Sequence, residues 1–264
     1  MSTPAAGLEE PLLALDGVTR AFGGLIAVDG VSFAVRPGEI FGLIGPNGAG
    51  KTTSINVISG LLPPTAGHIR FRGARIDGLP AHRVTARGLA RTYQSIRLFA
   101  GLSCLDNVLV GMHTRTRSAY WQRLLFLPAV RREEEQAATR ARRLLDRVGL
   151  GALAGTPAAG LPYGDQRRLE LVRALAAEPA LLLLDEPAAG MNRVERTALE
   201  ALLRALAAEG RTILLIEHDM PRVMRVCDRV AVLNFGHLIA EGTPAEISRD
   251  PAVIEAYLGV EEEE

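Results

Sequence analysis

The chain has 264 residues, in which 30 arginine and lysine residues balance 30 acidic ones and 48% of the residues are hydrophobic. This composition is that of a globular protein long enough for one or two domains with a sizeable core. No run of 18 apolar residues occurs, which excludes a transmembrane helix, and the zero net charge argues against a general nucleic-acid binder. Residues 1–11 lack the apolar stretch of a secretory signal, and the two cysteines have no metal or redox spacing, so we expect them to stay reduced.

The first third of the chain predicts a small antiparallel layer, a buried strand and a helix. Alternation of polar and apolar residues indicates short strands over Leu13–Asp29, Gly30–Val35 and His68–Gly73. Ile40–Ile44 is a short apolar run typical of a strand buried in a parallel sheet. Apolar residues then recur every three or four positions from residue 55 to 62, which predicts a helix that ends before Pro63.

The turn between that strand and that helix carries the P-loop pattern Gly-x4-Gly-Lys-Thr, formed by Gly45, Pro46, Asn47, Gly48, Ala49, Gly50, Lys51 and Thr52. In this motif backbone amides and the positive end of the helix dipole hold phosphates, while the lysine reaches the β- and γ-phosphates. Lys51 is the one lysine of the chain, and every other long cationic side chain is arginine. A compact ammonium fits a phosphate loop better than a planar guanidinium does. Thr52 is placed to offer its hydroxyl to Mg²⁺.

The remainder of the chain predicts a helical middle followed by further buried strands. Residues 95–177 show helical patterns and no convincing strand, and a helix is predicted over Asn192–Glu209. Strands are predicted at Leu181–Leu184, Ile213–Ile216 and Val230–Leu233. The predicted fold class is α/β: a P-loop NTPase (RecA-like) core over residues 12–94 and 178–259, with a small antiparallel β layer and an inserted α-helical subdomain over 95–177. Residues 260–264 form an acidic tail of this single domain.

Two carboxylates end the predicted strand at Leu181–Leu184. At the carboxyl end of a parallel strand, acidic side chains face the ligand crevice. Asp185 fits the carboxylate that holds Mg²⁺ in P-loop enzymes, and Glu186 fits the base that polarises the attacking water. The alternative is a helix cap, because Pro187 follows. His218 also ends an apolar strand, and taken alone it fits a structural role at least as well.

These pieces together resemble the ATP-binding subunits of ABC transporters, and the resemblance runs from about Leu13 to Gly259. Six motifs of that family occur in its order: the P-loop, Q-loop, signature, magnesium carboxylate, D-loop and H-loop. The resemblance implies that ATP and Mg²⁺ are the cofactors, that Phe22 stacks on adenine, and that the nucleotide loop extends to Thr53. It also implies roles for Gln94 of the Q-loop, which would reach Mg²⁺ and the water, for the D-loop residues Ala189–Asn192, and for His218 of the H-loop.

The signature segment departs from the family pattern Leu-Ser-Gly-Gly-Gln. The family would place Pro162, Tyr163, Gly164, Asp165 and Gln166 against the nucleotide of an opposing ATPase subunit. Here proline replaces the serine that binds the γ-phosphate, and tyrosine and aspartate replace a glycine and the glutamine. Gly164 remains, so backbone amides at the start of a helix could still meet phosphate. We expect this signature to impair the partner's site rather than the one that contains Lys51. The D-loop likewise ends in Asn192 rather than aspartate.

The exact residues in and around these motifs are similar to those of one subgroup, the ATPases that serve bacterial branched-chain amino-acid importers. The similar segments are Phe22–Gly24, Arg91–Gln94, Tyr163–Glu170, Asp185–Asn192, Glu217–Met220, Glu241–Pro244 and Ala256–Gly259. The resemblance implies a peripheral protein at the cytoplasmic face of the inner membrane. Its partners would be a second ATPase, related or identical, two permeases and, indirectly, a periplasmic binding protein, with no nucleic acid.

Alternatives remain open at this point. ATPases of urea and short-amide importers are very similar, and a lipopolysaccharide or lipid exporter or a soluble ABC ATPase are further readings. The permease contact is expected after Gln94, in Ser95–Leu102, although Leu98 and Phe99 would serve equally well as core residues. A second apolar aromatic patch, Tyr120–Leu127, could touch membrane or permease, or pack within the helical subdomain.

Overall fold

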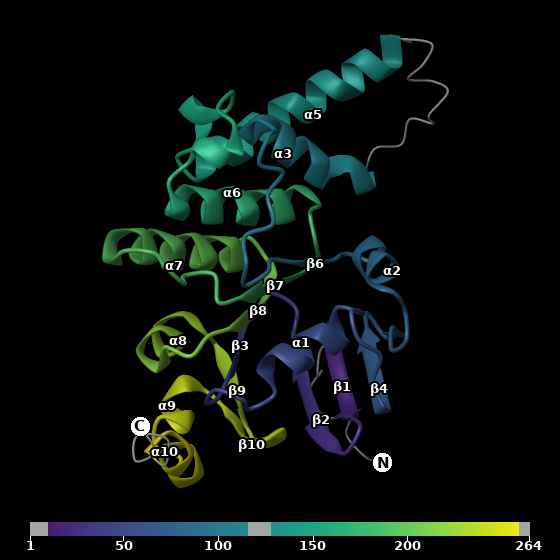
Figure 1. Ribbon diagram of the computed structural model, residues 1–264, viewed down its shortest axis with the longest axis vertical. Coiled ribbons are helices and arrows are strands. Elements are labelled where there is room, and N and C mark those ends of the chain that lie inside the picture. Colours follow the sequence, from purple (N-terminus) through teal and green to yellow (C-terminus); the bar gives the residue numbers. More distant parts are fainter. Residues whose placement is uncertain (1–9, 116–127, 259–264) are drawn as a thin grey trace, which may run out of the picture. The chain divides into compact units, whose positions relative to one another are not determined.

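The structure is a computed structural model that describes residues 10–115 and 128–258 (Figure 1). Contacts divide the chain into two compact units: residues 1–87 with 203–264 form the first unit, and residues 88–202 form the second. The helical segment expected over residues 95–177 lies in the second unit together with two strands. Its bounds as a subdomain stay a prediction.

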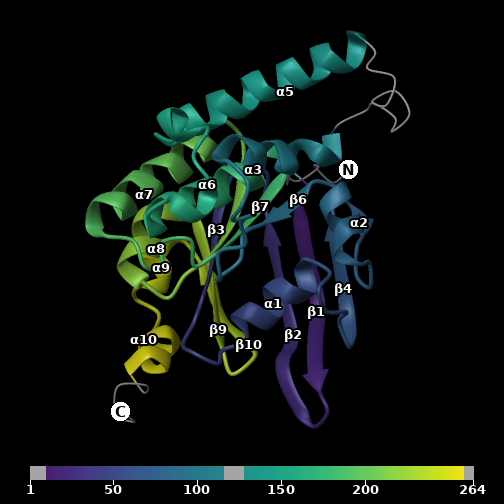
Figure 2. The ribbon, with the colours of Figure 1, turned by 45° about the horizontal axis from the view of Figure 1, so that its top comes forward.

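An antiparallel sheet in the first unit has the strand order β2-β1-β4-β5, and its strands are β1 (Leu13–Phe22), β2 (Leu25–Val35), β4 (Ala66–Phe71) and β5 (Ala74–Arg75). Figure 2 shows β1, β2 and β4 side by side. The predicted strand over Leu13–Asp29 is wrong in extent, because the chain turns at Gly23 and Gly24 and β2 then runs on without a break through Asp29. Gly23 has φ 59°, a backbone conformation that glycine adopts without steric cost.

The first unit also contains strands in the order β10-β9-β3-β8. At its centre β3 (Ile40–Ile44) pairs in parallel with β8 (Thr212–Ile216) and with β9 (Arg229–Asn234), whereas β10 (His237–Gly242) is antiparallel to β9. Every residue of β3 and β8 is buried, as expected for parallel strands covered on both faces. The helices of this unit are α1 (Lys51–Ile58), α2 (Ala81–Ala86), α8 (Met220–Val226), α9 (Pro244–Ile247) and α10 (Pro251–Leu258).

The second unit pairs two short parallel strands, β6 (Leu89–Arg91) and β7 (Leu181–Asp185), and carries most of the helices. They are α3 (Cys104–Gly111), η1 (Met112–Arg115), α5 (Pro128–Arg147), η2 (Gly151–Leu153), η3 (Ala158–Gly160) and α6 (Tyr163–Ala176), while α7 (Arg193–Ala208) runs across the boundary into the first unit. In the described part of residues 95–177 there is no strand beyond an isolated bridge, which confirms the helical prediction. No helix in the described ranges is long and apolar enough to cross a bilayer.

Helix packing gives the second unit a core of its own. Helix α3 contacts both α5 and α6 (Figure 1). Helix α5 contributes Ala141 and Leu145 to this core, both at 0% exposure. The other buried members of this cluster are Cys104, Val108, Val148, Leu150, Ala158, Leu161, Leu169, Val172 and Ala176. Helix α6, which opens with the predicted signature, is therefore anchored along its length by apolar packing.

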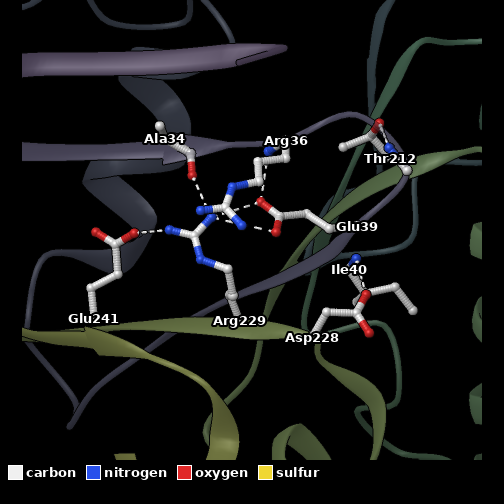
Figure 3. Close-up of polar contacts among 9 residues, drawn as sticks. Ala34, Arg36, Glu39, Ile40, Thr212, Asp228, Arg229 and Glu241 are labelled. Atoms are coloured by element: carbon white, nitrogen blue, oxygen red, sulfur yellow. Dashed lines mark hydrogen bonds and ion pairs between the residues drawn. The ribbon is translucent and has the colours of Figure 1, made fainter. Parts of the chain in front are cut away.

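A half-buried arginine, Arg229, joins strands of the first unit's sheets at the end that lies away from the P-loop. Arg229, the first residue of β9, donates to the carbonyl oxygen of Ala34 at 3.2 Å and pairs with Glu39 at 3.1 Å and with Glu241 (Figure 3). Glu39 precedes β3, whereas the P-loop follows it. The network thus joins β2, β3, β9 and β10 at the opposite end of β3 from the nucleotide loop.

Both cysteines are free thiols in buried positions. Burial raises the pKa of Cys227 to about 12, and burial also raises the pKa of Cys104. Because the thiolate is the reactive form of cysteine, both thiols are held in their unreactive protonated state at neutral pH.

Candidate active site

The P-loop is a tight turn between β3 and α1 in which two glycines have no room for a side chain. At Gly45, with φ 150°, a Cβ atom would lie 2.1 Å from the carbonyl oxygen of Leu233. At Gly50, with φ 98°, it would lie 2.4 Å from the carbonyl oxygen of Ala27. Both approaches involve backbone, so only glycine fits at these positions. The backbone of this loop is therefore determined by its own sequence and by the neighbouring β strands.

Lys51 is buried although it is charged, and it begins helix α1. Its ammonium group donates to the carbonyl oxygens of Gly45 at 2.6 Å and Pro46 at 2.8 Å, so the side chain closes over its own loop. The N-cap residue Gly50 has no side chain with which to cap the first-turn amides. A compact cation beside an uncapped helix N-terminus is the arrangement that binds phosphate.

Three other predicted nucleotide contacts, Thr52, Thr53 and Phe22, belong to the same unit as the loop. Thr52 is exposed and Thr53 is half-buried, both in the first turn of α1. Phe22 ends β1 with 43% of its surface exposed, and the guanidinium carbon of Arg20 lies 4.6 Å from the centroid of its ring. A cation over one aromatic face holds the ring in place and leaves an exposed surface for a planar ligand. Adenine stacking on Phe22 stays a prediction.

The turn between β9 and β10 braces the P-loop, a role that sequence reasoning missed. The amide of Gly236 donates to the carbonyl oxygen of Ala49 at 3.1 Å, and its carbonyl accepts from the amide of Asp29 at 2.9 Å. Phe235 and Gly236 both have positive φ, 44° and 83°. The one available signal was a glycine between two strand-like runs, which marks a turn but does not show what the turn contacts.

His218 lies just after β8 and is exposed, and its role stays a prediction. Parallel pairing of Leu43 with Ile216 brings the ends of β3 and β8 to the same edge of the sheet, so His218 leaves at the edge where the P-loop begins. Its neighbours have structural partners: Glu217 pairs with Arg222 at 2.7 Å, and Asp219 caps helix α8.

In the second unit, Asp185 is the last residue of β7 and is 3% exposed. Arg91, the last residue of the paired strand β6, lies 3.1 Å from one of its carboxylate oxygens. Burial raises the pKa of Asp185, and the charge of Arg91 opposes that rise. A buried carboxylate is costly without a partner. Arg91 therefore stabilises the ionised form of Asp185. The sequence analysis had included this arginine only as part of the Q-loop motif.

Glu186 and Gln94 lie in contact in the second unit. The side-chain amide nitrogen of Gln94 donates to Oε2 of Glu186 at 3.3 Å. Glu186 has φ 47°, in the left-handed region that is unfavourable for residues other than glycine. Such backbone strain is found preferentially at functional sites. The carboxylate is half-buried and the glutamine is exposed, so water can reach the pair.

The predicted signature opens helix α6, with Pro162 as the N-cap residue and Tyr163 as the first helical residue. The amides of Asp165 and Gln166 both donate to the carbonyl oxygen of Pro162 at 3.0 Å. The carboxylate of Asp165 forms an ion pair with Arg168, and the side chain of Gln166 donates to a backbone carbonyl one residue before the cap. Both polar side chains are therefore engaged within their own segment.

The D-loop asparagine caps helix α7 and links it to the signature. Asn192 and Glu195 form a reciprocal pair, in which the amide of Glu195 donates to Oδ1 of Asn192 at 3.0 Å and the amide of Asn192 donates to Oε2 of Glu195 at 2.9 Å. A Cβ atom on Gly164 would lie 2.3 Å from Oε1 of Glu195. The carboxylate of Glu195 thus packs directly against Gly164, and a side chain at that position would have to displace it.

The expected permease-contact segment is divided between core and surface. Leu98 packs against the helical core, whereas Phe99 is 50% exposed and Leu102 is 37% exposed. The Phe99 amide donates to Oδ1 of the buried Asn107 at 2.9 Å, which holds the segment against α3. The second patch, Tyr120–Leu127, lies outside the described residues.

The predicted site residues divide between the two units. The P-loop, Phe22 and His218 belong to the first unit, and the second unit contains Gln94, Asp185, Glu186 and the signature. Each unit contains one set of residues that suits its predicted role. In the first unit, a helix N-terminus without a side-chain cap lies beside a buried ammonium group. In the second unit, a glutamine–glutamate pair lies next to a buried aspartate.

Comparison with known proteins shows similarity over nearly the whole chain. A family model described as "ABC transporter" matches residues 28–189, and one described as "Branched-chain amino acid ATP-binding cassette transporter" matches residues 237–263. The high-affinity branched-chain amino acid transport ATP-binding protein LivG of Salmonella typhimurium is 46% identical over 96% of this chain and 99% of its own length. The lipopolysaccharide export system ATP-binding protein LptB of Acidithiobacillus ferridurans is 36% identical over 94% of this chain and 97% of its own length.

Among solved structures, the ADP conformation of an ATP-binding cassette of an ABC transporter matches with a TM-score of 0.82 and 30% sequence identity, covering 95% of this chain and 100% of that one. A match of this quality over the full length extends to the arrangement of strands and helices and not to the sequence motifs alone. It confirms the fold class expected from the P-loop and from the alternation of strands and helices.

Proposed function

The chain belongs to the ABC transporter family, and from that premise we propose that it is the ATP-hydrolysing subunit of an importer of branched-chain amino acids. One observation carries the proposal: the 46% identity to LivG extends over 96% of the chain. The match of residues 237–263 to a family model of branched-chain amino acid transporters supports the same substrate class. Similarity to LptB is lower, at 36%, so lipopolysaccharide export ranks second.

ATP is the substrate of the proposed reaction, and the P-loop binds its phosphates. Lys51 exchanges its two carbonyl partners for phosphate oxygens, and Phe22 stacks on the adenine ring. Thr52, Asp185 and Gln94 would hold Mg²⁺, and their hydroxyl, carboxylate and amide oxygens are hard ligands suited to that ion. Bound Mg²⁺ neutralises negative charge on the phosphates.

Glu186 is the proposed base for hydrolysis. Its half-buried carboxylate accepts a proton from the water that attacks the γ-phosphate in line, and Gln94, which contacts it at 3.3 Å, orients that water. His218 is proposed to hold the γ-phosphate and the water from the end of β8. Positioning and electrostatic stabilisation by these groups, rather than covalent chemistry by the protein, account for catalysis of phosphoryl transfer.

Transport requires partners that the proposal identifies by class. A second ATPase subunit, related or identical, would close over the nucleotide and present its signature to it, and two permeases would follow that movement. The exposed apolar residues Phe99 and Leu102, just after the Q-loop, are proposed to contact a permease. A periplasmic binding protein would deliver the amino acid, and this chain would work at the cytoplasmic face of the inner membrane. Pro162 lacks the hydroxyl of the family serine, so sites of a heterodimer would be unequal.

Uptake of labelled leucine, with labelled urea in parallel, tests the substrate class in host cells whose only copy of the chain carries Lys51→Ala. We expect leucine uptake to be lost and urea uptake to persist. The control is Arg70→Ala, which removes an exposed cation of β4 and should leave uptake unchanged. Loss of urea uptake alone would replace the amino-acid assignment with an amide importer. Full uptake of both compounds would contradict the proposal of an importer and would favour the hypothesis of lipopolysaccharide export. A lipopolysaccharide transport assay would then test that hypothesis.

A further inference from the structure

Arg167, on the first turns of α6, holds the backbone of the Q-loop. Its side chain is 3% exposed, and its two terminal nitrogens donate to consecutive carbonyl oxygens, that of Tyr93 at 2.7 Å and that of Gln94. The Gln94 side chain in turn contacts Glu186. A single guanidinium thus fixes the main chain of the residue that is proposed to orient the attacking water, an effect that none of the motif roles includes.

The same guanidinium is joined to the loop that follows Glu186. The hydroxyl of Tyr163 accepts from Nη2 of Arg167 at 3.0 Å and from Nε at 3.2 Å. The ring of Tyr163 packs against Gly190, where a Cβ atom would lie 2.6 Å from the ring and where φ is 74°. Tyr163 replaces a glycine of the usual signature, so this tyrosine connects signature, D-loop and Q-loop in a way that the usual sequence does not offer.

A buried carboxylate balances the charge of Arg167. Glu170, one helical turn further along α6, is 1% exposed and lies 3.4 Å from Nη1 of Arg167, and it accepts the amide of Arg97 at 3.2 Å. Burial raises the pKa of Glu170, and the charge of Arg167 opposes that rise. Helix α6 therefore holds the Q-loop at two backbone carbonyls through Arg167, and it holds the downstream residue Arg97 at its amide through Glu170 and at its carbonyl through Arg173.

We propose that Arg167 is a positioning residue, which ties the start of α6 to Gln94 so that movement of the signature helix and placement of the glutamine opposite Glu186 are one event. The inference rests on the proposed function and deepens it. Two carbonyls and a hydroxyl need several donors in a fixed plane, which guanidinium supplies and ammonium does not. Lysine at this position would keep the charge that Glu170 requires but would lose the geometry.

A double-mutant cycle on ATP hydrolysis by the purified full-length chain tests the proposal. Arg167→Lys should lower kcat about tenfold with KM for ATP changed by less than about twofold, because misplacement of a catalytic group affects the chemical step. In a Gln94→Ala background the same change should lower kcat by less than about twofold, because the residue on which it acts is already absent. Tyr163→Phe keeps the ring against Gly190 and should cause a smaller loss, about threefold, that also vanishes in that background.

The matched control is Arg229→Lys, the same change at a half-buried arginine that also bonds a carbonyl and carboxylates (Figure 3). It lies at the opposite end of β3 from the P-loop. It should leave kcat unchanged. Losses from Arg167→Lys that persist in full in the Gln94→Ala background, or that Arg229→Lys reproduces, would overturn the positioning role. Lys51→Ala in the same assay separates the two claims: hydrolysis undiminished by that change would overturn the proposed function, and the inference with it.

Discussion

The P-loop and the Q-loop are both bent segments at the predicted site, but they are held in different ways. The P-loop is shaped by its own glycines, and its lysine bonds carbonyls only five and six residues away in the chain. The Q-loop is held by side chains from a distant helix, since Arg167 lies 74 and 73 residues beyond the carbonyls it binds. A loop of the first kind is ready before the ligand arrives, whereas a loop of the second kind follows whatever moves the helix.

This difference teaches where regulation can act in the molecule. A side chain at Gly45 or Gly50 would meet neighbouring backbone, so the loop geometry at these two positions is open to glycine alone. The attachment of the Q-loop depends on side-chain hydrogen bonds and on one buried ion pair, and a single substitution can remove any of these contacts. We therefore expect substitutions in the first region to affect binding of ATP and those in the second to affect its hydrolysis.

The Q-loop and the residues it contacts, Glu186 among them, are here called the side-chain-held region. The largest expected effect comes from Glu186→Gln in this region. Removing a general base lowers hydrolysis by about 100- to 10,000-fold, while ATP binding should be retained because the P-loop is untouched. The rate of phosphate release measures hydrolysis, and equilibrium binding of a fluorescent ATP analogue measures ATP binding separately. Robust turnover by this variant would remove Glu186 from the role of base and would place the hydrolytic group elsewhere.

Gly50→Ala tests the backbone-shaped region. A Cβ 2.4 Å from the carbonyl oxygen of Ala27 forces the loop to move, so ATP should bind at least about tenfold more weakly. Gly210→Ala is the control, because Gly210 also has positive φ, at 82°, but no atom lies within 4 Å of the added methyl. Binding by the Gly210 variant should equal that of wild type. Equal effects of the two changes would show that φ strain and not loop contact determines the result.

Arg91→Met tests whether the side-chain-held region depends on buried charge. Arg91 and Asp185 are 6% and 5% exposed as side chains, and removing one partner of a buried pair costs about 3–5 kcal/mol. Urea unfolding of the full chain measures the loss. Arg75→Met, at an exposed pair with Asp77, is the comparison and should cost much less. Similar losses at both positions would contradict the account given for Asp185.

The smallest effect concerns that exposed pair and depends on pH. Hydrogen bonding to Arg75 lowers the pKa of Asp77 from 3.8 to about 2. A depressed carboxyl pKa stabilises the folded state above the unfolded value, and this stabilisation is lost as pH falls from 3.8 through about 2, where the folded carboxyl is half protonated. Asp77→Asn should therefore lower stability by less than about 1 kcal/mol near neutral pH, and its difference from wild type should shrink steadily as pH falls from 3.8 to about 2. A difference that stayed constant over that range would contradict the ion-pair explanation.

Local features of this chain could be predicted from the sequence, and contacts between distant segments could not. The P-loop, β3 and the acids after β7 were predictable because their patterns occupy a few consecutive residues and match the period of the element. The predicted end of β1 was wrong because polar and apolar residues continue to alternate across Gly23. Only the pairing of β1 with β2 reveals the turn. Arg91 and Arg167 were assigned no contacts, because each acts through a partner more than 70 residues away.

The most direct test of the central claim is ATP hydrolysis by the purified chain with its one lysine replaced by arginine. Lys51 is 7% exposed and its ammonium lies between two carbonyl oxygens of its own loop, a space that suits a compact cation. We predict that Lys51→Arg abolishes hydrolysis as completely as Lys51→Ala does, with the fold retained. Hydrolysis at the wild-type rate by the arginine variant would contradict the assignment of Lys51 to the phosphates and, with it, the proposed ATPase site.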